Sequence, residues 1–136
     1  MPETAVVRTR EQQRAEKAFQ RIRAASNEPW AREYGRLCLR LPALIQQCGL
    51  CQALTFYEAK GAADVRGQSR NPEFHRLLED LAEVSGLAPN RAVLLDEVRK
   101  ADLVRYQWMT RELLRCAVWF KRYAEAYLKV QPGEEE

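Results

Sequence analysis

Apolar residues recur every three or four positions along most of the chain, which is the period of an amphipathic α-helix. The first such pattern predicts a helix over residues 4–26, with Thr4 as a candidate N-cap. Its apolar face consists of Ala15, Ala18, Phe19, Ile22 and Ala25. One side of this helix is therefore expected to be buried.

A break at Asn27 and Pro29 precedes a second helical pattern, which is carried by Trp30, Tyr34, Leu37 and Leu41. Pro42 is predicted to bend or restart this helix, because proline lacks an amide donor and clashes with the carbonyl one turn back. Gly49 suits a C-terminal cap or a tight kink. A third helix is then expected over residues 50–60.

The second half of the chain contains three further helical patterns. Residues 61–72 are rich in turn formers and predict an exposed loop. An Asn-Pro pair then begins a helix that ends before Gly86, with the apolar stripe Phe74, Leu77, Leu78, Leu81 and Val84. A shorter helix over 91–102 and a long one over 103–130 follow, and no strand pattern competes with them.

The 136 residues are enough for one domain with a single core. We therefore predict an all-α fold, a compact single-domain helical bundle of about five or six helices with a long C-terminal helix. Residues 1–131 form the domain and residues 132–136 an acidic C-terminal tail. The N-terminus is polar and no stretch has the roughly 20 apolar residues of a membrane span, so a cytoplasmic protein without membrane contact is expected.

The candidate chemistry begins with a CxxC pair, Cys48 and Cys51. A redox pair normally lies in a strand-helix-strand context, which is missing, and a zinc site needs four ligands, usually in two close pairs. Cys38, Cys116 and the lone His75 supply no second pair, so buried thiols are favoured and no metal or cofactor is predicted. His75 is interpreted as a helix-surface residue without a nucleophile beside it, and we expect the chain not to be an enzyme.

Cations recur at helical spacing in the first and last helices. Those of the first helix follow steps of four, three and four, and those of the last helix follow steps of four, seven and seven. They are Arg10, Arg14, Lys17 and Arg21, then Arg111, Arg115, Arg122 and Lys129. Three of the 19 acidic residues are the terminal glutamates, so the helical part is more basic than the net charge of +3 suggests.

Trp108 and Trp119 are separated by about three helical turns and flank the cations of the last helix. Large aromatics beside arginines are typical of a protein interface or of a surface for single-stranded nucleic acid. Two other interpretations stay open, namely that both cation rows are simply solvated and that both tryptophans pack against a neighbouring helix. The spacing alone predicts a helical interaction domain, with nucleic acid as one possible partner.

Three segments stand in a characteristic order: EYGRLCLRLPALIQQCGLCQALTFYEAKG, then FHRLLEDLAEVSG, then YQWMTRELLRCAVWFKRYAEAYLK. This order resembles the small helical subunit of the type III-B CRISPR (Cmr) effector complex over nearly the whole chain. The positions that carry the resemblance are Tyr34, Gly35, Leu41, Pro42, Leu44, Ile45, Gly49, Leu50, Leu54, Phe56, Tyr106, Thr110, Glu112, Trp119, Lys121, Ala124 and Glu125. In this pattern the Leu-Pro and Gly-Leu elements shape a helical junction, and neither cysteine of the CxxC pair is a defining residue.

The resemblance implies a non-catalytic subunit that packs along the backbone subunits of a ribonucleoprotein filament in antiviral defence. Its expected partners are these backbone subunits, the large signalling subunit and the assembly of guide RNA with target RNA, with possible self-association along the filament. The basic residues named above would hold target RNA, and Trp108 and Trp119 would contact a protein partner. The alternative is a purely architectural adaptor that meets acidic protein surfaces and has no direct RNA contact.

Overall fold

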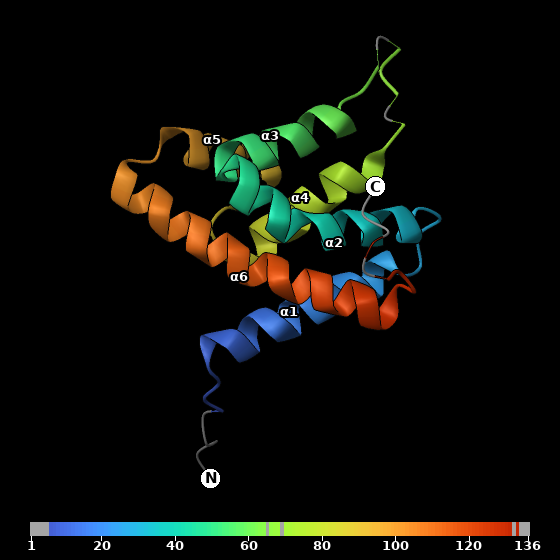
Figure 1. Cartoon of the computed structure of the whole chain (residues 1–136), viewed down its shortest axis with the longest axis horizontal. Coiled ribbons are helices and arrows are strands. Elements are labelled where there is room, and N and C mark those ends of the chain that lie inside the picture. Colours follow the sequence, from blue (N-terminus) through green and yellow to red (C-terminus); the bar gives the residue numbers. More distant parts are fainter. Residues whose placement is uncertain (1–5, 65, 69, 132, 134–136) are drawn as a thin grey trace.

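The computed structural model describes residues 6–64, 66–68, 70–131 and 133, and within them the fold is all-α with six helices. The predicted fold class, with a long C-terminal helix, is confirmed (Figure 1). The helices are α1 (Arg10–Ala25), α2 (Ala31–Cys48), α3 (Leu50–Gly61), α4 (Pro72–Ser85), α5 (Arg91–Lys100) and α6 (Leu103–Tyr127). The predicted division at residues 131 and 132 stays a prediction, because residues 132 and 134–136 lie outside the described part.

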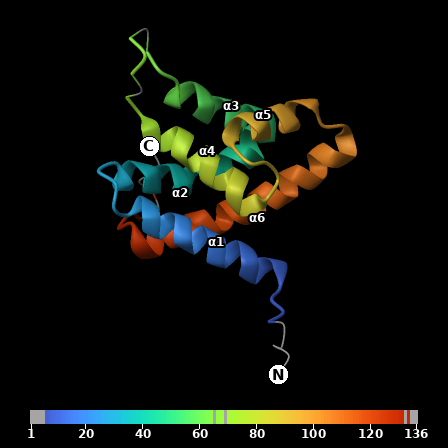
Figure 2. The ribbon, with the colours of Figure 1, turned by 180° about the vertical axis from the view of Figure 1, so that it is seen from behind.

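The longest helix, α6, runs across the molecule and packs against α2 and α1, with a smaller contact to α4. On the other side of the bundle α3 packs against α4, α2 and α5 (Figure 1). Seen from behind, α1 and α3 again lie at opposite edges, with α2, α4 and α6 between them (Figure 2). The helix α1 therefore lies along the edge of the bundle, against both α6 and α4.

The core is built from the apolar stripes of the helices, as their spacing predicts. Its largest fully buried side chains include Tyr34, Tyr57, Phe120, Ile22, Leu39, Leu41, Ile45, Leu50, Leu54, Leu77, Leu78 and Leu81. The two buried tyrosine hydroxyls both have partners: Tyr34 donates to the carboxylate of Asp80 at 2.5 Å, and Tyr57 donates to the carbonyl of Leu37 at 2.9 Å. Burial of these polar groups is thus compensated by hydrogen bonds.

The first helix begins later than predicted. Thr4 lies outside the described residues, and the observed N-cap is Thr9, whose hydroxyl accepts a hydrogen bond from the amide of Gln12 at 3.0 Å. The side chain of Gln12 accepts in return from the Thr9 amide at 2.9 Å, which completes a capping box. A Thr-x-x-Gln signal therefore defines the start of α1.

Pro42 does not end or restart the second helix, which continues to Cys48. A proline inside a helix removes the hydrogen bond from its own position to the carbonyl four residues earlier, here that of Cys38. The apolar stripe continues on both sides of it with the buried side chains of Leu41, Leu44 and Ile45. Burial of this stripe outweighs the cost of the missing hydrogen bond, so the predicted restart was wrong, and the predicted bend stays a prediction.

The CxxC segment is a junction between two helices. Cys48 is the last residue of α2, and Gly49 at φ 85° lies between the two helices. This left-handed conformation favours glycine. The amide of Cys51, in the first turn of α3, donates to the hydroxyl of Tyr106 at 2.9 Å, so a side chain of α6 satisfies this helix end.

Close contact between α3 and α4 depends on a second glycine. A Cβ atom added to Gly61 would overlap the ring of His75. His75 is half-buried, and its Nε2 lies 3.0 Å from the carbonyl oxygen of Glu58. The prediction of a simple helix-surface residue is therefore corrected, because the ring of His75 fills the space between the two helices.

The last helix ends at Tyr127, three residues before the predicted end. The following residues turn back onto α2, where a Cβ atom added to Gly35 would lie 3.0 Å from Cγ1 of Val130. Lys129 adopts φ 57° in this turn and does not belong to α6. Its predicted alignment with the helical cations was therefore wrong.

Candidate functional site

The candidate site comprises the surfaces of α1 and α6 that carry the two predicted rows of cations; Arg10 and Lys17 line a narrow hollow beside α4, and Arg115 and Arg122 line a separate hollow beside Trp119. At its centre lies an ion pair between Arg14 of α1 and Glu112 of α6. Nε of Arg14 is 2.6 Å from Oε2 of Glu112, and Nη2 of Arg14 is 2.7 Å from Oε1. Arg10 adds a third contact from its Nη2 to the same Oε1 at 2.9 Å. This geometry is the bidentate arrangement that fixes a guanidinium firmly against a carboxylate.

Burial makes this ion pair part of the core and removes Arg14 from the solvent. Arg14 is 8% exposed and Glu112 is 3% exposed. Hydrogen bonds from Arg14 lower the pKa of Glu112 to about 2, against the opposing effect of burial. The hydrogen bond to Glu112 also raises the pKa of Arg14. The predicted exposed ridge is therefore corrected at Arg14, whose guanidinium joins α1 to α6.

The other cations of α1 differ in solvent exposure and in ion pairing. Arg21 is half-buried and pairs with Glu83 of α4 at 2.5 Å. Lys17 is exposed and has no ion-pair partner among the described residues, and Arg10 remains largely exposed despite its contact with Glu112. The side chains that α1 presents to solvent from the predicted set are thus Arg10 and Lys17.

The cations of α6 are more exposed to solvent than those of α1. Arg111, Arg115 and Arg122 are all exposed. Arg122 contacts Glu125 at 3.3 Å, one helical turn away, whereas Arg111 and Arg115 have no ion-pair partner in the described part of the chain. We call these three residues the α6 cation row.

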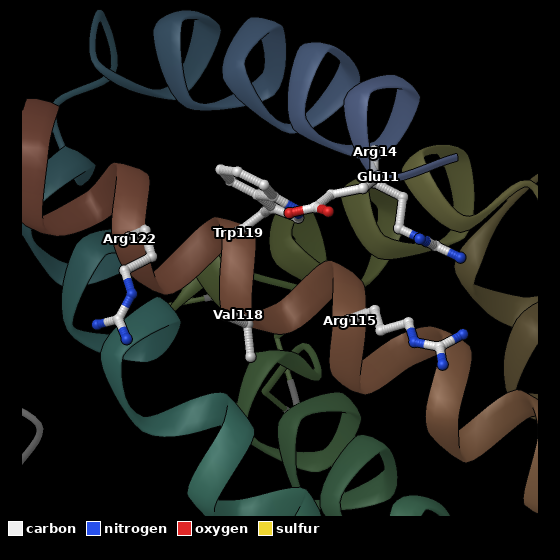
Figure 3. A pocket seen from close by; sticks show the side chains of 6 residues that line it. All are labelled: Glu11, Arg14, Arg115, Val118, Trp119 and Arg122. Carbon is white, nitrogen blue, oxygen red and sulfur yellow. The ribbon is translucent and has the colours of Figure 1, made fainter. Parts of the chain in front are cut away.

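A shallow hollow of about 450 Å³ lies beside the α6 cation row, between α6 and α1. It is lined by Glu11, Arg14, Arg115, Val118, Trp119 and Arg122. Figure 3 shows Trp119 extending from α6 toward α1, where Glu11 and Arg14 lie, while Arg115 and Arg122 project from α6 on either side of Val118. The half-buried indole of Trp119 packs on the Tyr123 ring with centroids 5.4 Å apart. The hollow therefore combines an aromatic wall with three arginines and one glutamate.

Trp108 lies in a different environment, near the beginning of α6. It is 40% exposed, and the guanidinium carbon of Arg105 lies 5.0 Å from its ring centroid, a cation–π distance. The neighbouring side chains of Leu103 and Val104 are also exposed. We call these three residues, together with Arg105, the Trp108 patch. The sequence predicted only Trp108 as a contact residue. The sequence signal for this patch was the pair of adjacent apolar residues, Leu103 and Val104, at the start of the last helix.

The sequence also carried a signal for the buried ion pair. Arg14 lies four residues before Ala18 and eight before Ile22, so it is on the apolar stripe of α1. Glu112 lies between the buried residues Met109 and Cys116 of α6 in the same way. A single charge of each sign on two facing apolar stripes predicts a buried pair.

The cysteines and histidine do not gather into a site. Cys38 and Cys116 are buried, Cys48 is exposed and Cys51 is half-buried. Burial raises the pKa of Cys38 and raises that of Cys116 to about 12. Within the described ranges, no group of three or more histidine, cysteine or acidic side chains could hold a metal ion. No helix among the same residues has the length and apolar character needed to cross a membrane.

The fold and the site together define a small all-α domain with exposed cations on α1 and α6. The family model described as CRISPR-associated protein (Cas_Cmr5) matches residues 10–127. The CRISPR system Cmr subunit Cmr5 of Thermus thermophilus is 39% identical over 124 residues, which cover 90% of this chain and 99% of that protein. The chain belongs to the Cmr5 family of CRISPR-associated proteins, as the sequence resemblance predicted.

A solved structure supports the same assignment. The crystal structure of a CRISPR-associated Cmr5 family protein from Thermus thermophilus superposes with a TM-score of 0.78. It is 38% identical in sequence, and the match covers 88% of this chain and 97% of that chain. The helical arrangement described above is thus that of the family.

Proposed function

We propose that this chain is a non-catalytic small subunit of a type III-B CRISPR RNA-guided effector complex, the Cmr complex. In this proposal it packs along the backbone subunits, adjoins the large signalling subunit and serves antiviral defence in the cytoplasm. Membership of the Cmr5 family supports the subunit role, because the similar protein from Thermus thermophilus is a Cmr subunit. The exposed cations of α1 and α6 support a role in holding target RNA.

The α6 cation row is the observation that carries the RNA-binding part of the proposal. Arg111 and Arg115 are exposed cations without an ion pair in the described part of the chain, so phosphate groups would not have to displace an acidic side chain from them. Trp119, predicted from the sequence as a protein contact, lies beside Arg115, where we propose that its ring can also stack with an unpaired base. Sequence-independent contacts of this kind suffice when base pairing with the guide RNA provides specificity.

Fewer residues of α1 are proposed to contact RNA than its cation spacing predicted. Lys17 and Arg10 are the residues of α1 that we retain for phosphate contact, together with Lys129 after α6, all of which are exposed. Arg14 and Arg21 would have to leave Glu112 and Glu83 to bind phosphate. We propose that these two instead hold α1 in place.

The Trp108 patch is the proposed contact to a protein neighbour in the complex. An exposed tryptophan among apolar residues, with an arginine over its ring, has the composition of an interface hot spot. It lies on α6 about three turns from Trp119, so the same helix can contact protein at its beginning and RNA from its middle onward. Self-association along the filament would use exposed apolar surfaces like the Trp108 patch.

The direct test is charge reversal in the assembled complex. The variant Arg115→Glu with Arg122→Glu should weaken target-RNA retention, and the slope of binding against salt should become shallower by about one for each phosphate group that is no longer bound. The matched control, Lys60→Glu with Arg99→Glu, changes the net charge equally on α3 and α5. Unchanged retention and unchanged salt dependence in the first variant would show that the α6 cation row does not contact RNA.

The alternative function is an architectural adaptor whose arginines contact acidic surfaces of neighbouring subunits. Exposed arginines serve this role as well as RNA binding, so a salt effect alone does not separate the two. Photo-crosslinking from target RNA in the assembled complex does separate them. Crosslinks to the hollow that contains Trp119 support RNA contact, whereas crosslinks confined to other subunits support the adaptor.

A further inference from the structure

Aromatic side chains continue along α6 from the hollow that contains Trp119 toward the end of the helix. Trp119, Tyr123 and Tyr127 follow one another at steps of four, and the centroids of neighbouring rings are 5.4 Å and 5.8 Å apart. The planes of neighbouring rings differ by 33° and 39°, so the rings form a ladder along one side of α6. We call these three residues the aromatic ladder.

The helix α1 covers part of this ladder. Phe19 of α1 packs on two of its rings in edge-to-face geometry, with centroids 5.7 Å from Tyr123 and 5.4 Å from Tyr127. Trp119 and Tyr123 are half-buried, whereas Tyr127 remains 53% exposed. The aromatic ladder therefore presents open ring surface to solvent, most of it at Tyr127.

Cations lie at both ends of the aromatic ladder. At its beginning, Arg115 and Arg122 line the hollow that contains Trp119 (Figure 3). At its end lies a second hollow of about 280 Å³, lined by Ser26, Ala31, Arg32, Tyr127, Leu128 and Lys129. Arg32 and Lys129 are both exposed. The turn that removes Lys129 from α6 thus places it in the same hollow as Tyr127.

The unpaired acids beside the aromatic ladder come from α1. Glu11 lines the first hollow, and Glu16 is among the charges that raise the pKa of Tyr123 beyond the larger effect of burial. On α6, Glu125 is paired with Arg122 at 3.3 Å. A polyanion on this surface would therefore place its phosphate groups along α6 and its uncharged parts toward the seam with α1.

We propose that the aromatic ladder binds unpaired bases of RNA, with Tyr127 as the outermost stacking surface and with phosphate groups on Arg122 and Lys129. Aromatic rings between cations are the combination that holds a single strand without sequence preference. The eight residues from Trp119 to Tyr127 span about 12 Å of helix, which is the length of about three stacked bases. This inference rests on the RNA contact proposed for α6 and names the part of the RNA that the ladder binds.

The test measures binding of a short oligouridylate to the full chain at low salt, where phosphate contacts are strongest. Tyr127→Leu keeps an apolar side chain but removes the ring, and it should weaken binding about tenfold, the size of one lost stacking contact. The matched variant Tyr127→Phe keeps the ring and should bind like wild type. Neither variant changes the charge, so the slope of binding against salt should stay the same, unlike that of Arg115→Glu with Arg122→Glu.

An abasic oligomer with the same number of phosphate groups separates stacking from charge. It should bind wild type and Tyr127→Leu equally, because it has no bases to stack on the ladder. In the full chain labelled with ¹⁵N, oligouridylate should shift the indole N–H signal of Trp119, and the abasic oligomer should shift it much less. The indole signal of Trp108, about three turns away on α6, should stay in place.

Four results would overturn the proposal. Equal binding of oligouridylate by wild type and Tyr127→Leu, with weaker binding by Arg115→Glu with Arg122→Glu, would exclude the ladder and leave the RNA contact of the α6 cation row intact. Unchanged binding in both variants would refute the ladder and that RNA contact together. Equal losses in Tyr127→Leu and Tyr127→Phe would assign the effect to the hydroxyl group instead of stacking. Loss of protein neighbours from the assembled complex of Tyr127→Leu, with unchanged oligouridylate binding, would identify a protein contact.

Discussion

Replacement of Glu112 by glutamine tests whether the buried ion pair holds α1 to α6. Glutamine keeps nearly the same shape and one acceptor oxygen but removes the negative charge. Arg14 then remains buried without a counter-charge, a situation that costs several kcal/mol in proteins. The folded state should therefore lose stability without a large change in packing.

The size of the loss follows from the pKa of Glu112, which is about 2 in the folded chain against an ordinary value of 4.5. This difference corresponds to about 3 kcal/mol of stability at neutral pH. Because the pKa is lowered on folding, this contribution is fully present above pH 4.5 and is lost as the pH falls toward 2. By pH 3, about 2 kcal/mol of it should be gone.

Urea unfolding of wild type and Glu112→Gln at pH 7, 5 and 3 measures this contribution. The difference in unfolding free energy should be about 3 kcal/mol at pH 7 and should shrink to about 1 kcal/mol at pH 3. The control Glu125→Gln removes the partner of the exposed Arg122 and should cost less than about 1 kcal/mol. A difference for Glu112→Gln below about 1 kcal/mol at pH 7, or one that does not change with pH, would refute the proposed role of the ion pair.

Three other changes probe contacts that position the helices. Burial raises the pKa of Asp80 from 3.8 to about 6, so the chain should be about 1 kcal/mol more stable at pH 5 than at pH 7 from this group, and Asp80→Asn should abolish that gain in urea unfolding. Gly61→Ala should lower stability by about 1–3 kcal/mol through its clash with His75, and adding His75→Ala should recover part of the loss in thermal unfolding. Tyr106→Phe removes the acceptor of the Cys51 amide and should cost about 1 kcal/mol, with faster hydrogen exchange at that amide as the local sign.

Local signals in the sequence were enough to predict the helices that carry clear start and stop residues. The helix α4 begins at Pro72, and Gly86 follows its last residue at φ 70°, as the proline and the later glycine predict, although the side chain of the predicted cap Asn71 makes no capping hydrogen bond. Its apolar stripe also faces the core, with Leu77 and Leu81 fully buried. The start and end of a helix and the spacing of its apolar residues depend on residues close together in the chain, so they can be predicted from a single sequence.

Features that depend on distant residues could not be predicted in this way. The effect of Pro42 depends on how much apolar surface the rest of α2 buries against other helices, and this is a tertiary quantity. The position of Lys129 depends on the turn that brings Val130 onto Gly35. The composition of the Trp108 patch likewise depends on which helices leave the beginning of α6 uncovered.

The corrected role of Arg14 connects the fold to the proposed function. Helical spacing shows which cations share a side of a helix, but it does not show whether that side faces solvent or another helix. Here the ion pair between Arg14 and Glu112 fixes α1 beside the middle of α6, and Arg14 forms part of the wall of the hollow that contains Trp119. Loss of this ion pair should therefore change the shape of the hollow even though the residues of the α6 cation row are unchanged. If target RNA lies in the hollow, Glu112→Gln should weaken RNA retention while leaving Arg111 and Arg115 exposed. The ion pair between Arg14 and Glu112 and the α6 cation row would then act as one site.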